Sequence, residues 1–129
     1  MREEVKHRDP AAEFYTPEGC FIIELSNIAS DPDASIAEAR VLPGKTTRWH
    51  RVIGITERYV LLSGDGEVEV GNLPSERVSP GDVVLVPPGV RQRITNVGSK
   101  DLVFLAICTP RFERAAYEDI DPATMPGLA

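Results

Sequence analysis

Residues 43–66 read PGKTTRWHRVIGITERYVLLSGDG, and residues 80–96 follow the same plan as PGDVVLVPPGVRQRITN. Each stretch opens with a Pro-Gly pair, which favours a tight turn and cannot continue a central strand. The runs that follow are rich in Val, Ile, Leu and Thr, residues that favour short β-strands between turns. We therefore expect the two stretches to form the working wall of a small β-barrel.

Three polar side chains, His50, Glu57 and Gln92, occupy spaced positions along this predicted wall. Side chains two residues apart in a strand point to the same face of the sheet. An inward Glu57 therefore implies an inward Tyr59, and an inward Gln92 implies an inward Ile94. We expect a concave cavity in which a few polar groups lie among apolar neighbours, as in a pocket for a small molecule.

The segment around His50 adds further candidates. By the same alternation, an inward His50 implies an inward Val52 and an inward Arg48. A guanidinium group is well shaped to bind a carboxylate or phosphate of a ligand. The alternative for Arg48 is a surface arginine at the end of a strand. The substrate-binding candidates are therefore Arg48, Val52, Tyr59 and Ile94.

The spacing of these residues resembles the two sequence motifs of the cupin superfamily, G-x5-H-x-H-x3,4-E-x6-G and G-x5-P-x-G-x2-H-x3-N. The matching positions are Gly44, His50, Glu57, Gly64, Gly81, Pro87, Gly89 and Asn96. So many matches at fixed spacing are a specific indication of fold. The sequence departs from the motifs at two positions, where Val52 and Gln92 stand in place of histidines.

This resemblance implies an all-β fold, an antiparallel double-stranded β-helix (jelly-roll) barrel with a short C-terminal helix or tail. We place the barrel at residues 19–110, an N-terminal segment at 1–18, and the helix or tail packing on the barrel at 111–129. The resemblance also implies a homodimer, formed through outer faces of the barrel or an exchanged N-terminal segment.

Metal-binding members of the family use two histidines and the glutamate of the first motif and the histidine of the second. Here only His50 and Glu57 match, and Gln92 offers a neutral, weaker amide oxygen. One interpretation is a single divalent transition metal held by His50, Glu57 and Gln92. The other is a polar network without metal, in which His50 and Glu57 hydrogen-bond each other and Gln92 completes the cluster.

The function implied by the resemblance has two forms. The first is a metal-dependent enzyme of the dioxygenase, decarboxylase, lyase or isomerase class, with His50 as a ligand and Glu57 as a ligand or general base. The second is a metal-free, non-catalytic barrel that binds or senses a ligand. In both forms the partner is a small molecule, anionic or sugar-like, inside the barrel.

Composition limits the other possibilities. The chain has 129 residues, which suits one domain, and a net charge of -6, which argues against nucleic acid as a partner. No run of eighteen apolar residues predicts a membrane span, and the polar N-terminus lacks an apolar signal region. We therefore expect a cytoplasmic protein in which Cys20 and Cys108 are free thiols.

The turns divide the remaining chain into short predicted strands. Strands 57–63 and 67–70 should pair as a hairpin across Gly64-Asp65-Gly66, and strand 102–109, the most hydrophobic, should be the most central. Residues 111–120 contain helix formers and predict a short closing helix or a tail, and residues 121–129 a loose end. The other expected strands are 20–26, 35–42, 46–53, 76–79, 82–87 and 91–96.

Overall fold

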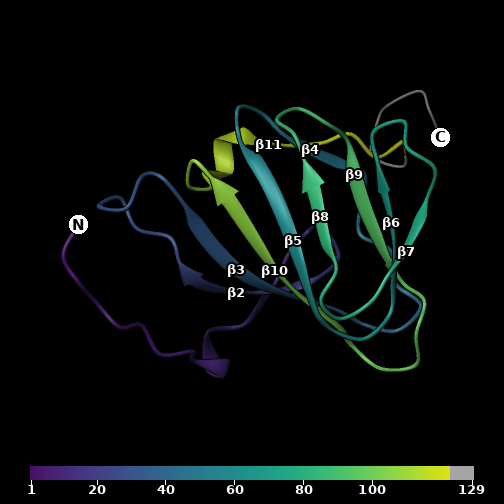
Figure 1. Cartoon of the computed structure of the whole chain (residues 1–129), viewed down its shortest axis with the longest axis horizontal. Coiled ribbons are helices and arrows are strands. Elements are labelled where there is room, and N and C mark those ends of the chain that lie inside the picture. The colour runs from purple at the N-terminus through teal and green to yellow at the C-terminus, as the bar shows by residue number, and fades with distance from the viewer. Residues whose placement is uncertain (123–129) are drawn as a thin grey trace.

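The computed structural model describes residues 1–122 and shows two antiparallel β-sheets facing each other (Figure 1). In spatial order, the larger sheet contains β1 (Phe14–Tyr15), β2 (Phe21–Ser26), β3 (Ser35–Val41), β10 (Leu102–Thr109), β5 (Thr56–Ser63) and β8 (Val83–Val86). The smaller sheet contains β11 (Tyr117–Asp119), β4 (His50–Val52), β9 (Gln92–Asn96), β6 (Gly66–Val70) and β7 (Glu76–Val78). This arrangement confirms the predicted double-stranded β-helix.

The helical content of the described residues is two 3₁₀ turns, η1 (Pro10–Ala12) and η2 (Arg114–Ala116). Within residues 1–122, none of the helical segments has the length and apolar character needed to cross a membrane. Cys20 and Cys108 are both buried and both free, as predicted.

The core lies between the two sheets because alternate side chains of each strand turn inward. Val41, Leu61 and Leu102 have 1% or less of their surface exposed, and Ile94 packs against them from the smaller sheet. Strand β10 lies between β3 and β5, in agreement with its predicted central position. The larger sheet therefore forms a continuous floor onto which the smaller sheet closes.

The predicted hairpin between residues 57–63 and 67–70 is wrong. Strand β5 pairs with β10 and β8, whereas β6 pairs with β9 and β7, so the chain changes sheet at the Gly64 turn. Gly64 has φ +87°, and a Cβ atom there would lie 2.6 Å from the carbonyl oxygen of Asp101. Only glycine accommodates both the backbone conformation and this close approach.

The predicted strand 46–53 is also shorter than expected. Regular pairing in β4 begins at His50, because Thr47 leaves the expected alternation and turns inward. The Thr47 backbone N–H donates to the Ile94 carbonyl at 2.9 Å, and its hydroxyl accepts from the Ile94 N–H at 3.0 Å. The alternation that places His50 and Val52 inside therefore does not extend back to Arg48.

The predicted closing helix at 111–120 is wrong, and the alternative of a tail on the barrel is right. These residues form η2 and then β11, which pairs with β4 through Tyr117–Val52 and Asp119–His50. We call residues 111–121 the strap, because they run from the end of β10 to the edge of the smaller sheet. Of the predicted loose end 121–129, residues 123–129 lie outside the described part.

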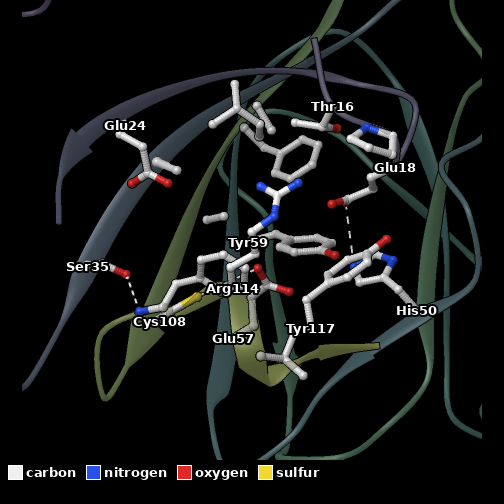
Figure 2. Close-up of a pocket in the computed structure, with 18 of the residues that line it drawn as sticks. Thr16, Glu18, Glu24, Ser35, His50, Glu57, Tyr59, Cys108, Arg114 and Tyr117 are labelled. Atoms are coloured by element: carbon white, nitrogen blue, oxygen red, sulfur yellow. Dashed lines mark hydrogen bonds and ion pairs between the residues drawn. The ribbon is translucent and has the colours of Figure 1, made fainter. Parts of the chain in front are cut away.

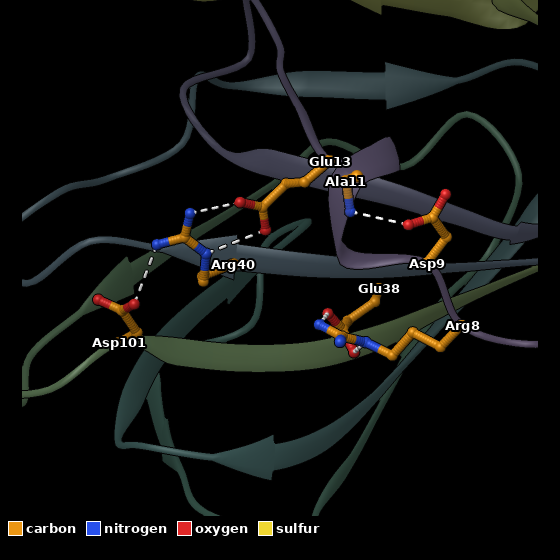
Figure 3. A network of polar contacts seen from close by, with 7 residues as sticks. All are labelled: Arg8, Asp9, Ala11, Glu13, Glu38, Arg40 and Asp101. Carbon is orange, nitrogen blue, oxygen red and sulfur yellow. Dashed lines mark hydrogen bonds and ion pairs between the residues drawn. The ribbon is translucent and has the colours of Figure 1, made fainter.

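The N-terminal segment lies along the larger sheet and is fixed to it by ion pairs (Figure 3). Arg8 contacts Glu38 of β3 at 2.8 Å. Arg40, also on β3, binds both Glu13 and Asp101, the latter at 3.0 Å. The short β1 strand that follows pairs with β2, so this segment extends the larger sheet and borders the cavity described next.

Candidate functional site

A cavity of about 180 Å³ lies inside the barrel, and the strap and the loop that joins β1 to β2 form part of its lining. Polar side chains surround the cavity on several sides, with Glu24 and Ser35 on one side and Glu18 and His50 on the other (Figure 2). Apolar residues of the floor come from β2, β3 and β10 and are Ile22, Ala37, Ala39, Phe104 and Ala106. The small alanine side chains on two neighbouring strands leave the space that larger residues would fill.

Glu57 is the central polar residue of the cavity. Its Oε2 atom accepts a weak hydrogen bond from the Cys108 thiol at 3.7 Å, while its Oε1 atom is shielded from solvent and has no partner among the described residues. Burial raises the pKa of Glu57 to about 7, and repulsion by the Glu18 carboxylate adds to the rise, whereas His50, Gln92 and Cys108 oppose it. Glu57 therefore exists in both protonation states near neutral pH.

His50 borders the cavity beside Glu57 and is 2% exposed. Its Nδ1 atom lies 2.7 Å from the Arg48 carbonyl oxygen, so this nitrogen carries a proton and donates it. Its Nε2 atom lies 3.5 Å from Oε1 of Glu18. The imidazole stacks on the ring of Tyr117, with 5.3 Å between the ring centroids. The predicted hydrogen bond between His50 and Glu57 is absent from the described contacts, because both nitrogens of His50 face other groups.

Gln92 stands opposite His50 in the β4–β9 pair and is almost completely buried. Its amide oxygen accepts a hydrogen bond from the Tyr59 hydroxyl. Tyr59 lines the cavity as predicted, as does Val52. Ile94 faces the inside of the barrel but packs into the core rather than lining the cavity.

Of the two positions expected for Arg48, the structure shows the one outside the cavity. The Arg48 guanidinium lies outside the cavity lining and donates to Asp119 of β11 at 2.8 Å. This ion pair instead ties the beginning of β4 to the strap. The physical reason is the break in alternation at Thr47, which turns the Arg48 side chain away from the barrel interior.

The donor set does not fit the metal centre that the family motifs describe. Val52 supplies no ligand, and the amide oxygen of Gln92 already accepts from Tyr59. Within the described residues, no three side chains of the His, Cys, Asp and Glu types gather as a metal site. His50 and Glu57 alone are fewer protein ligands than structural or catalytic zinc sites use.

Most of the other cavity-lining residues were missed by sequence reasoning, and three of them matter most for the chemistry of the site. Glu18 comes from the turn before β2, which we had assigned to the N-terminal segment, and its Pro-Glu-Gly sequence gives no sign of contact with His50. Tyr117 and Arg114 come from the strap, which we had read as a possible helix. The Tyr117 hydroxyl is buried and, like Glu57 Oε1, lacks a partner among the described residues. The Tyr-Glu-Asp sequence of residues 117–119 carries no strand signal that would have placed them.

Comparison with known proteins agrees with this architecture. The model of the cupin domain family matches residues 37–108. An uncharacterized protein of Methanocaldococcus jannaschii is 31% identical over 115 residues, covering 88% of this chain and 89% of that protein. The family match runs from within β3 to within β10 and includes the cavity residues of β4 and β5.

Solved structures share the fold. A variant of Streptomyces Pac13, a nucleoside dehydratase, solved with uridine has a TM-score of 0.74 and 16% identity, covering 94% of this chain and 93% of that one. A predicted oxalate decarboxylase of Thermotoga maritima has a TM-score of 0.68 and 26% identity, covering 76% of this chain and 90% of that one. At 16% identity the likeness to Pac13 establishes the fold alone.

Proposed function

This chain belongs to the cupin domain family, and on that basis we propose that it binds a small, anionic or sugar-like molecule inside the barrel and catalyses proton transfer on it with Glu57 and His50. One observation carries the proposal. Two buried polar atoms, Glu57 Oε1 and the Tyr117 hydroxyl, face the same cavity without partners in the described part of the chain. Buried polar groups are normally hydrogen-bonded, so a ligand with hydroxyl or carbonyl groups completes this site.

Glu57 is the general base of the proposed reaction. A base works best when its pKa lies near the operating pH, and the pKa of Glu57 is raised to about 7. The unpartnered Oε1 atom is free to take a proton from a carbon next to a carbonyl group. The apolar floor of the cavity keeps water from competing for that atom.

His50 and Glu18 form the acid. Because Nδ1 of His50 already donates to a backbone carbonyl, the contact of Nε2 with the Glu18 carboxylate at 3.5 Å becomes an ion pair when Nε2 also carries a proton. That proton can pass to a departing hydroxyl group. Glu57 then takes a proton from carbon, the carbon–oxygen bond breaks, a carbon–carbon double bond forms, and water leaves. Glu57 finally gives its proton to solvent and the His50–Glu18 pair takes one from solvent, which restores the starting state.

This reaction is a dehydration. If a proton returns to carbon before the hydroxyl group departs, the same acid–base pair catalyses an isomerisation instead. Pac13, with the same fold, is a nucleoside dehydratase, which supports the proposal at the level of fold. The step uses no metal, in keeping with a donor set that does not fit one.

The experiment follows carbon–hydrogen exchange. The protein is incubated in D₂O with a panel of hydroxy acids, sugar acids and nucleosides, and proton NMR records loss of carbon-bound hydrogen or appearance of an alkene. We expect exchange with at least one compound, abolished in Glu57→Gln and retained in Glu67→Gln, which removes an exposed carboxylate of β6. Binding without exchange in the wild-type protein would identify the non-catalytic barrel instead.

A further inference from the structure

Arg114 extends its guanidinium over the cavity from a strap that is fixed on both sides. Before it, the Phe112 N–H donates to the Ser35 hydroxyl at 2.9 Å, and the Phe112 carbonyl accepts from Asn27 at 2.9 Å. After it, the Ala116 carbonyl accepts from the Ile53 N–H at 2.8 Å. The backbone of η2 is therefore held in place, so the fold fixes the position from which the Arg114 side chain extends.

The Arg114 guanidinium has no hydrogen-bond or ion-pair partner among residues 1–122. Its neighbours in and beside the strap are different, because each binds a carboxylate. Arg48 binds Asp119, Arg51 binds Glu118, and Arg111 binds Glu113. Arg114 is the arginine that lines the cavity, and its guanidinium donors are available to a ligand there.

The two carboxylates near Arg114 do not serve as its partners, which leaves its guanidinium available to a group of the ligand. Figure 2 shows its guanidinium in the middle of the view, with Glu24 on one side and Glu18 on the other. Both carboxylates line the cavity, yet neither is an ion-pair partner of Arg114. Glu18 faces His50, and burial raises the pKa of Glu24, which favours its neutral form.

We propose that Arg114 binds a carboxylate or phosphate group of the ligand, so that the anionic end of the ligand lies under the strap and its reacting carbon faces Glu57. This inference rests on the proposed function and adds the anion-binding residue to it. A planar guanidinium offers parallel donors that match both groups. Binding of the anionic end to Arg114 would also orient the ligand, because Arg114 lies in the strap whereas Glu57 lies on β5 in the barrel wall.

The first test uses simple anions and nitrogen NMR of arginine side chains. Sodium acetate and sodium phosphate are titrated against sodium chloride at equal ionic strength, and the Arg114 Nε–H resonance is assigned by its loss in Arg114→Lys. We expect a saturable shift at Arg114 and none at Arg77, an exposed arginine of β7. Acetate and phosphate distinguish the two possible sources of the anionic group. Absence of a saturable shift with both anions overturns the inference.

The second test compares ligands with and without an anionic group. Calorimetry measures D-gluconate against D-gluconamide and D-ribose 5-phosphate against D-ribose. We expect the anionic member of at least one pair to bind about tenfold or more tightly, since a charge-assisted hydrogen bond contributes that much. Arg114→Gln should remove the preference, Arg77→Gln should leave it unchanged, and equal affinities in the wild-type protein overturn the inference.

The two proposals fail separately. If Arg114→Gln abolishes the anion preference but no compound exchanges hydrogen in D₂O, the anion site stands and the acid–base function falls. If exchange depends on Glu57 but keeps its Michaelis constant in Arg114→Gln, the function stands and the anion site falls. Thermal unfolding of each variant confirms that the strap and barrel remain folded.

Discussion

Oε1 of Glu18 lies 3.5 Å from Nε2 of His50, and this contact joins the turn before β2 to β4 of the smaller sheet. The same carboxylate raises the pKa of Glu57, after burial the largest cause of the rise to about 7. Glu18, His50 and Glu57 therefore form one electrostatically coupled group. A change of charge at any member should be measurable at the others.

Replacing Glu18 tests this coupling. Glu18→Gln removes a negative charge near Glu57, so it should lower the pKa of Glu57 from about 7. Carbon NMR of protein with labelled glutamate carboxyl groups measures that pKa directly, and Glu57→Gln assigns the signal. Glu67→Gln serves as the control because its carboxylate binds Arg77 on the surface. An unchanged pKa in Glu18→Gln contradicts the coupling.

The raised pKa of Glu57 should also appear in the stability of the protein. The folded state binds this proton more tightly than the unfolded chain, whose glutamate pKa is near 4.5. Between pH 4.5 and about 7 the folded state therefore carries more protons, and the free energy of unfolding falls as pH rises. The fall is at most about 3 kcal/mol from this residue, and it is complete above pH 7.

Urea unfolding of the wild-type protein and Glu57→Gln at a series of pH values measures this contribution. The glutamine cannot ionise, so the variant should gain stability relative to the wild type as pH rises through the window. The difference between the two proteins cancels the other titrating groups. A difference that stays constant from pH 4.5 to 8 would show that the pKa of Glu57 is not raised.

The sequence predicted the barrel well because turns and alternation are local. Gly44, Gly64, Gly81 and Gly89 all have positive φ, the conformation that makes glycine informative at a turn. Alternation then placed His50, Glu57, Tyr59 and Gln92 correctly on the inner face. It failed where the backbone leaves the strand, as at Thr47, and Arg48 was misplaced for that reason.

The rest of the site depends on long-range pairing that no local pattern encodes. Glu18 meets His50 because the β1–β2 turn crosses the open end of the barrel. Tyr117 and Arg114 reach the cavity because β11 pairs with β4, and residues 111–120 are equally compatible with a helix by their propensities. Such contacts are set by the closure of the two sheets rather than by the segments themselves.

Metal content tests the interpretation of Gln92. Because the Gln92 amide oxygen is engaged by Tyr59, we expect the protein purified without an affinity tag to hold less than one metal ion per chain by elemental analysis. The double substitution Val52→His with Gln92→His restores the imidazoles of the family motifs and should raise the metal content. Stoichiometric metal in the wild-type protein that is lost in His50→Ala would contradict this account.

The homodimer predicted from the family remains to be tested, and we propose that the outer face of β8 takes part in it. Val83 and Leu85 point away from the core of the barrel and are 56% and 65% exposed. β8 is an edge strand of the larger sheet, and its neighbour β5 exposes Leu62. Exposed apolar groups on an edge strand favour pairing with another chain.

Light scattering with size-exclusion chromatography measures the assembly state. Val83→Lys with Leu85→Lys places two charges on this face and should convert a dimer into monomers. Leu73→Lys is the matched control. Leu73 is 69% exposed but lies in the loop that joins β6 to β7, away from β8. The double variant should keep its fold, because neither side chain contributes to the core. A dimer that survives the double substitution at micromolar concentration places the interface on another face of the barrel.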